Sequence, residues 1–159
     1  MEQVILVDDN NQQIGLADKA TVHTKNTPLH RAFSLFLFNS KGELLLTQRA
    51  LGKKTFAGVW TNTVCGHLSP GEKIEEAAKR RLKDELGITC HSEASAEVPP
   101  QRDPAFGGKS HTRSFTAFRM TKVSDYRYRF ADKSGIIENE ICPILVGYYD
   151  GEVKPNPLE

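Results

Sequence analysis

The sequence predicts a single α/β (α+β) domain, spanning residues 1–159, with several short strands and one long helix. Three observations support this prediction. A chain of 159 residues is long enough for one domain with a buried core. Segments rich in Val, Ile, Leu and Phe alternate with polar turns, which is typical of strands. In one segment apolar side chains recur at every fourth position, as they do on one face of a helix.

The first half of the chain contains the clearest strand signals. Polar residues at 8–12 and a glycine-containing segment at 40–42 indicate turns, and each turn is flanked by apolar runs. Pro28 excludes a continuous helix over 24–30. The long apolar run that begins at His30 and its shorter successor are expected to form a hairpin. The expected strands are 4–7, 14–17, 30–38 and 44–47.

One helix is expected from about 72 to 86. Ser69 and Glu72 have the form of a capping box, and Gly87 suits a left-handed cap at the C-terminal end. One face carries the apolar stripe, and Arg81 and Glu85 share a neighbouring face. The residues of the stripe are Ile74, Ala78, Leu82 and Leu86.

Two further strands are expected after a long connection. Residues 90–112 contain Pro and Gly, have weak periodicity, and are longer than connections in compact domains usually are. We expect this inserted segment to be a lid, a dimer contact or a disordered loop. Aromatic and basic residues alternate over 126–130, and a turn at 132–135 leads into an apolar strand that begins at Ile136.

Glu138 and Glu140 stand one residue apart inside that last strand, so both carboxylates lie on the same face. Burying two like charges is costly unless a cation or a shared proton offsets their repulsion. A solvated edge strand with two surface carboxylates is the alternative. The apolar neighbours on both sides favour a metal ion or a catalytic proton instead.

Composition argues against several classes of function. Lys and Arg number 21 against 20 Asp and Glu, so a general nucleic-acid or membrane-surface binder is disfavoured. The first nine residues are partly acidic and lack a long apolar stretch, so we expect neither a signal peptide nor a transmembrane span. The cysteines, Cys65, Cys90 and Cys142, are odd in number and lack framework spacing, which predicts reduced thiols in a cytoplasmic protein.

The segment from 66 to 88 resembles the Nudix box, a loop and helix that present glutamates to a metal on a diphosphate. Nudix hydrolases typically have glutamates where this chain has Arg81 and Asp84. A cation at position 81 opposes the binding of catalytic magnesium ions, so hydrolysis is disfavoured. The matching positions are Gly66, Glu72, Arg80, Leu82, Glu85, Gly87 and Ile88.

The chain is most similar to one branch of this superfamily, the type I isopentenyl diphosphate isomerases. The resemblance rests on 61–67, His23, His30, 126–128 and 138–140, and it extends to about Val146. It implies a Nudix-like mixed β-sheet with the Nudix helix packed against it. It also implies interconversion of isopentenyl and dimethylallyl diphosphate by protonation and deprotonation.

Two other functions stay open. One is a Nudix hydrolase of a nucleoside or prenyl diphosphate, and the other is an inactive domain that binds diphosphates or a protein partner. The family continues beyond the glutamate strand through a segment with a tryptophan and a closing helix, so the chain is expected to be shortened at its C-terminus. The implied partner is a small prenyl diphosphate, with no nucleic acid or membrane, and monomer and homodimer stay open.

The resemblance also implies the chemical roles of the site residues. Moving the double bond requires an acid and a base on opposite faces of the alkene. The implied pair is Cys65 and Glu140, with Tyr128 beside Glu140 to deliver or orient the proton. A divalent ion (Mn²⁺, Zn²⁺ or Mg²⁺) is implied as a cofactor, and three imidazoles argue against Mg²⁺. Its implied ligands are His23, His30, His67, Glu138 and Glu140.

A second cation, Mg²⁺, is implied on the substrate diphosphate. Glu85 and the backbone carbonyl of Cys65 are its implied ligands, in keeping with its preference for oxygen. Trp60 is expected either in the core or in the wall of the alkyl pocket. The basic residues that match the family's diphosphate clasp are Lys19, Arg49, Lys53 and Arg81. Ordinary surface positions are expected for Lys41, Lys54, Lys73 and Lys79.

Overall fold

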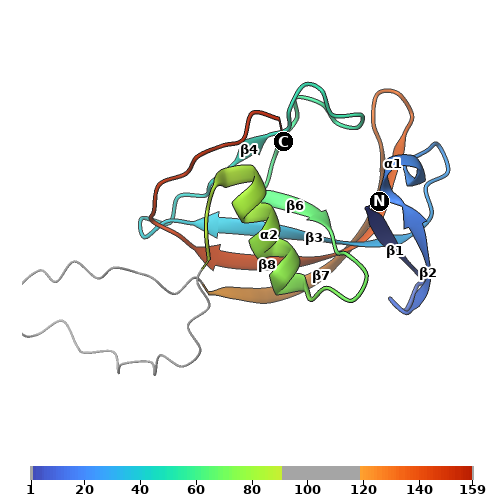
Figure 1. Ribbon diagram of the computed structural model, residues 1–159, viewed down its shortest axis with the longest axis horizontal. Helices are drawn as coiled ribbons and strands as arrows, with labels where there is room; N and C mark the ends of the chain where they lie inside the picture. Colours follow the sequence, from blue (N-terminus) through green and yellow to red (C-terminus); the bar gives the residue numbers. More distant parts are fainter. Residues whose placement is uncertain (1, 91–118, 159) are drawn as a thin grey trace, which may run out of the picture.

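The computed structural model describes residues 2–90 and 119–158, so nearly all of the predicted insertion at 90–112 lies outside the described residues. A mixed β-sheet forms the body of the protein, and helix α2 lies across one of its faces (Figure 1). The elements are β1 (Gln3–Val7), β2 (Gln13–Asp18), α1 (Lys19–Val22), β3 (His30–Phe38), β4 (Thr47–Gln48), β5 (Trp60–Thr61), β6 (Val64–His67), α2 (Ile74–Leu86), β7 (Met120–Ala131) and β8 (Ile137–Tyr148). The predicted fold class is therefore confirmed.

Strand β3 lies at the centre of the main sheet. The strand order is β2-β1-β3-β8-β7, and β6 also pairs with β3. The β3–β8 pairing is parallel and places His30 beside Glu140, whereas β6 is antiparallel to β3 and places Cys65 beside Ser34. Since β6 and β8 occupy opposite edges of β3, residues from three strands meet on the same face of the sheet.

The two faces of β3 differ in chemistry because successive side chains point to opposite sides. Phe33, Leu35 and Leu37 face α2 and are almost completely buried. They pack against the apolar stripe of the helix, in which Ala78, Leu82 and Leu86 are buried and Ile74 is partly buried. The intervening residues of β3 face away from the helix, toward the candidate site.

Helix α2 begins at Ile74, two residues later than predicted. The Glu72 carboxylate does accept the Ser69 N–H at 2.8 Å, but this bond closes the preceding loop. The helix itself starts after Lys73, whose N–H donates to the Glu76 carboxylate at 3.2 Å. Gly87 has φ of 66°, which confirms the predicted left-handed cap.

The predicted hairpin after β3 is only partly formed. Phe38 and Leu44 make an isolated bridge, and the returning strand is reduced to β4, which pairs with β5 instead. The side chain of Thr63 interrupts the ladder, because its hydroxyl accepts the Leu37 N–H at 2.8 Å and donates to the Leu45 carbonyl at 2.7 Å. The Leu45 N–H still donates to the Leu37 carbonyl at 2.9 Å, so a residue distant in sequence replaces one of the two backbone bonds of this pair.

Short helix α1 was not predicted. It is capped by Asp18, whose carboxylate accepts the Ala20 N–H at 2.9 Å. Helix α1 turns the chain from β2 toward His23. Within the described part of the chain, every helix is too short or too polar to cross a lipid bilayer.

Candidate active site and metal centre

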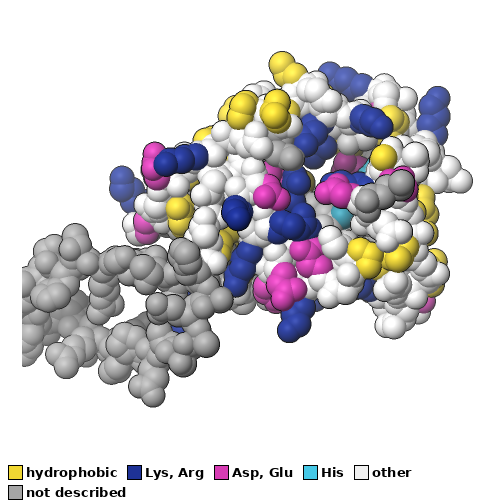
Figure 2. All heavy atoms as spheres, in the orientation of Figure 1, with side chains coloured by type: hydrophobic (Ala, Val, Ile, Leu, Met, Phe, Trp, Pro, Cys, Tyr) yellow, Lys and Arg dark blue, Asp and Glu magenta, His cyan; other side chains and the backbone are white. Residues whose placement is uncertain are grey.

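A cavity of about 500 Å³ contains nearly all of the predicted site residues. Figure 2 shows it as a hollow with histidine inside and with basic and acidic side chains around it. His30 is the exception, because its side chain is fully buried behind the cavity wall. The predicted residues that line the cavity are Lys19, His23, Arg49, Lys53, Trp60, Cys65, His67, Arg81, Glu85, Tyr128, Glu138 and Glu140.

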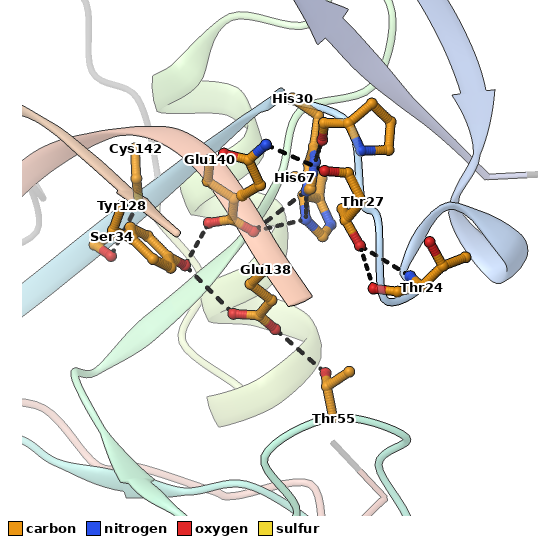
Figure 3. A network of polar contacts seen from close by, with 12 residues as sticks. Thr24, Thr27, His30, Ser34, Thr55, His67, Tyr128, Glu138, Glu140 and Cys142 are labelled. Atoms are coloured by element: carbon orange, nitrogen blue, oxygen red, sulfur yellow. Dashed lines mark hydrogen bonds and ion pairs between the residues drawn. The ribbon is translucent and has the colours of Figure 1, made fainter. Parts of the chain in front are cut away.

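Three histidines and one glutamate form a compact cluster. The ligand atoms of His23, His30, His67 and Glu140 all lie within 4.8 Å of one another. Glu140 Oε1 is 3.1 Å from His67 Nε2 and 3.4 Å from His30 Nε2, and the two Nε2 atoms are 3.1 Å apart. Figure 3 shows His30, His67 and Glu140 converging from three different strands.

The cluster fits a divalent transition-metal ion. Bonds of about 2.1 Å to such an ion place two tetrahedral donors about 3.4 Å apart, close to the observed separations. Two imidazole nitrogens facing each other also need a shared proton or a cation between them. The other nitrogen of His30, Nδ1, lies 2.9 Å from the Pro28 carbonyl, which orients the ring as in metal sites.

The pKa values of the cluster follow from its burial and its charges. Burial, and then the neighbouring His67 and His30, lower the pKa of His23 to about 4. Burial also lowers the pKa of His67. For His30, burial lowers the pKa, but the hydrogen bonds to Glu140 and the Pro28 carbonyl, together with the charges on Glu140 and Glu138, outweigh it and raise the pKa. Burial raises the pKa of Glu140, but hydrogen bonds from His30, His67 and Tyr128 outweigh it and hold the pKa below its ordinary value. Glu140 is therefore a carboxylate at neutral pH.

Tyr128 connects the two glutamates of β8. Its hydroxyl donates to Glu140 at 2.6 Å and is 3.4 Å from Glu138, as Figure 3 shows. Burial, and then the charge on Glu140, raise the pKa of Tyr128, so the hydroxyl keeps its proton. The register explains this contact, because Tyr128 of β7 lies directly opposite Glu140 of β8.

Glu138 is held by a different set of contacts. It accepts a hydrogen bond from the Thr55 hydroxyl at 3.2 Å, and the guanidinium of Arg49 donates to the Thr55 carbonyl at 3.1 Å. Burial, and then the charge on Glu140, raise the pKa of Glu138. Glu138 is not in the four-residue cluster, so its role as a metal ligand stays a prediction. Thr55 was not predicted as a site residue, and nothing in its sequence context pointed to it.

Cys65 lies on β6, across β3 from Glu140 and on the same face of the sheet. Cys65 pairs with Ser34 and Glu140 with His30, so the two residues are offset by four positions along β3 as well as by two strand spacings across it. This separation leaves room for a small alkyl group between them. Burial raises the pKa of the Cys65 thiol to about 12, although nearby Arg49 lowers it. The thiol therefore carries its proton at neutral pH.

Helix α2 also contributes side chains to the cavity lining. Arg81 Nη2 lies 2.6 Å from Glu85 Oε1, and each side chain is about 15% exposed. The Arg81 side chain packs over Gly66, where a Cβ would lie 3.5 Å from it, in ordinary van der Waals contact. Lys54, which was expected on an ordinary surface, also lines the cavity and donates to the Ala20 carbonyl at 3.3 Å.

A second cavity, of about 400 Å³, adjoins the first. Arg49, Cys65, Tyr128 and Glu138 line both. Trp60 lines the first cavity only and is 64% exposed, so it is not part of the core. The apolar walls of the second cavity were not predicted. Those walls come from Phe36, Phe56, Val59, Tyr126, Phe130 and Ile144. The alternating aromatic residues of 126–130 were the one available signal.

Comparison with known proteins identifies the class of fold. The NUDIX domain model matches residues 28–157. The structure of DR0079 from Deinococcus radiodurans superposes with a TM-score of 0.66 at 18% identity, covering 99% of this chain and 78% of that one. A MutT protein from Methanosarcina mazei gives 0.52 at 21% identity, with coverages of 82% and 71%. The fold is that of a Nudix domain.

Sequence relatives identify the branch. A protein named isopentenyl-diphosphate Delta-isomerase from Saccharopolyspora erythraea is 45% identical over the whole chain, which spans 69% of that relative. Proteins of the same name from Corynebacterium efficiens and Klebsiella pneumoniae are 46% and 42% identical over 99% of the chain, which spans 72% of each. This chain belongs to the isopentenyl-diphosphate Delta-isomerase family.

Proposed function

We propose that this protein is an isopentenyl diphosphate Δ-isomerase that interconverts isopentenyl and dimethylallyl diphosphate. Besides family membership, one observation carries the proposal. Cys65 and the Tyr128–Glu140 pair lie on one face of the sheet with β3 between them, and both open into the same cavity. This placement suits an acid and a base that act on a small alkene between them.

The diphosphate is proposed to bind at the α2 side of the first cavity. Lys19, Arg49, Lys53 and Arg81 line this cavity and supply positive charge for phosphate oxygens. Glu85, beside Arg81, and the Cys65 carbonyl are the proposed ligands of a Mg²⁺ ion that accompanies the diphosphate. Arg81 occupies a position where Nudix hydrolases have a glutamate, which supports isomerisation over hydrolysis.

The alkyl group is proposed to extend toward the second cavity. That cavity adjoins Cys65 and Tyr128, and aromatic rings form much of its wall. The Tyr126 and Tyr128 rings are stacked with centroids 5.7 Å apart. Aromatic faces of this kind stabilise a nearby carbocation, which is the charge that develops when the double bond is protonated. Trp60 is proposed to form a wall of the first cavity beside this region.

The two proton transfers follow from the protonation states. One group gives a proton to the terminal alkene carbon, and the other removes a proton from the carbon on the far side of the tertiary centre. Cys65 keeps its proton, whereas Glu140 is ionised and accepts the hydrogen bond of Tyr128. We propose Cys65 and Glu140 as this pair, with the Tyr128 hydroxyl orienting the Glu140 carboxylate; in the reverse reaction their roles exchange.

His23, His30, His67 and Glu140 would hold the divalent ion, and Glu138 is proposed as a further ligand. Three imidazoles favour Zn²⁺ or Mn²⁺ over Mg²⁺. When bound, the ion supplies positive charge that fixes the Glu140 carboxylate in place. The hydrogen bond between His30 and the Pro28 carbonyl keeps the ring oriented for this role.

Isomerisation in heavy water tests the proposed function. The protein should convert isopentenyl diphosphate with incorporation of deuterium into the product and should leave nucleoside diphosphate derivatives intact. Cys65→Ala and Glu140→Gln should each lower kcat by about 10² or more, the usual loss for a general acid or base, while diphosphate binding persists. A Cys65→Ala protein that isomerises at the parent rate would remove the thiol from the reaction.

Metal content tests the histidine cluster separately. His67→Asn should lower the bound Mn²⁺ or Zn²⁺ per chain, measured by atomic emission after dialysis, because it removes a central donor of the cluster. Activity should fall with metal content. Lys73→Asn, an exposed substitution outside the cavity, is the control. Undiminished metal content in His67→Asn would place the ion elsewhere.

A further inference from the structure

The segment that follows β8 crosses the C-terminal end of helix α2. The Lys154 N–H donates to the Leu86 carbonyl at 2.8 Å, and the Asn156 N–H donates to the Glu85 carbonyl at 2.7 Å. The Asn156 side chain adds a third bond, from Nδ2 to the Asp84 carbonyl at 3.2 Å. The contact is close, since a Cβ added at Gly87 would lie 3.1 Å from the Cβ of Lys154.

These bonds satisfy the end of the helix. The last carbonyls of an α-helix have no partners within the helix and need donors from elsewhere. The Gly87 N–H donates to the Lys83 carbonyl at 3.1 Å. The crossing segment donates to the next three carbonyls along the helix. Asn156 alone supplies two of those donors. Its Oδ1 accepts the Leu158 N–H at 3.1 Å, which fixes the orientation of the amide.

The same segment is part of the cavity wall. Val153, Pro155 and Asn156 line the first cavity together with Glu85 and Leu86. Glu85 belongs to the last turn of α2, the part of a helix most prone to fray. The direction of its carboxylate, and the 2.6 Å contact with Arg81, therefore depend on how the helix end is held.

We propose that Asn156 is a positioning residue for the diphosphate side of the cavity. By bonding the carbonyls of Asp84 and Glu85, it keeps Glu85 and its partner Arg81 directed into the cavity. The inference rests on the proposed function, in which these two side chains serve the diphosphate and its magnesium ion. Asn156 acts through them and touches neither the alkene nor the proton-transfer groups.

Asn156→Ala tests the role, since it removes the side-chain bond to the Asp84 carbonyl, together with the bond from the Leu158 N–H, and keeps the backbone N–H. KM for isopentenyl diphosphate, and the Kd for inorganic diphosphate with Mg²⁺ measured by calorimetry, should both rise about 3- to 10-fold, as expected for loss of the one side-chain bond to the helix end. The value of kcat should change less than about twofold. Lys154→Ala is the matched control, because its exposed side chain is removed while its N–H is kept.

Asn156→Asp sharpens the test, since it replaces the donor with a carboxylate that faces the negative end of the helix. Its KM and Kd should exceed those of Asn156→Ala, even where thermal melts show both variants folded at the assay temperature. Unchanged diphosphate affinity in Asn156→Ala would overturn the inference, as would a fall in kcat that follows only the loss of folded protein. Altered diphosphate binding without isomerisation by the parent would instead contradict the proposed function and leave the inference standing.

Discussion

The two faces of the central sheet differ in what they contribute, although they are built from alternating residues of the same strands. On β3, Phe33 and Leu35 point toward α2 and are fully buried in apolar surroundings. His30 and Ser34 point to the other face, where they meet Glu140 and Cys65 across the neighbouring strands. The comparison shows that one pairing register sets both the core and the site, because a slip of one residue would exchange the two faces.

The face of the sheet that packs against α2 should determine the stability of the fold, and Phe33→Ala tests this most directly. Removing a fully buried phenyl ring should lower the free energy of unfolding by about 3–5 kcal/mol, measured by urea denaturation. Activity per folded molecule should change little, because the ring faces away from the cavity. Ser34→Ala, at the adjacent position on the opposite face, is the control and should cost much less. Equal losses from both substitutions would contradict the separation of the two faces.

At Gly66 and Arg81 the core face and the site face of the sheet are connected, because a side chain of α2 reaches the cavity. Arg81 comes from the helix side of the sheet, packs over Gly66 of β6, and lines the cavity. Arg81→Glu should weaken isopentenyl diphosphate binding by about 2 kcal/mol or more, because it places like charges together.

Lys83→Glu makes the same change of charge on an exposed position of α2 and should leave affinity nearly unchanged. Calorimetric titration of both variants measures the difference. An Arg81→Glu protein with the parent affinity would show that this side chain does not contact the substrate.

The site face should make the metal-free protein sensitive to acid. The pKa of His23 is about 4 in the folded protein, against an ordinary value of 6.5. The unfolded chain therefore takes up this proton first, and the stability that neutral His23 provides is lost as the pH falls from 6.5 toward 4. Partial exposure limits the effect to about 1 kcal/mol.

Urea denaturation at pH 7 and pH 5, with a chelator present, measures this loss. His23→Asn should show a smaller decrease between the two pH values, because the titrating group is absent. The comparison also separates His23 from His30, whose raised pKa acts in the opposite direction. Identical pH dependence in the parent and the variant would contradict the assignment.

Much of the fold could be predicted because its signals are local. The alternation of β3, β7 and β8 and the four-residue period of α2 each depend on neighbouring residues, and these elements are confirmed. The two elements that were predicted wrongly or missed lack such local signals. The returning strand after β3 is shorter than predicted because Thr63, from another segment, bonds the Leu37 N–H and the Leu45 carbonyl in place of one backbone bond. Helix α1 was missed because a single turn has little periodicity.

The candidate site shows the same division. The family resemblance predicted twelve site residues that line one cavity in the structure. It did not place Thr55 or Asn156, because their parts in the site depend on contacts with Glu138 and with the end of α2. The apolar second cavity was also missed. Its apolar walls come from four separate segments, and only one of them, 126–130, carries a recognisable pattern.

The parallel pairing of β3 with β8 has a consequence for how the protein folds. Ser34 and Cys142, which are in contact across this pair, lie 108 residues apart in the sequence. Closing a loop of that length costs chain entropy before the new contacts can compensate for it, so the centre of the sheet is expected to form late. During synthesis the histidines emerge from the ribosome long before Glu140. The complete cation-binding cluster therefore exists only after the last strand has docked, and a nascent chain has no finished site with which to capture the ion.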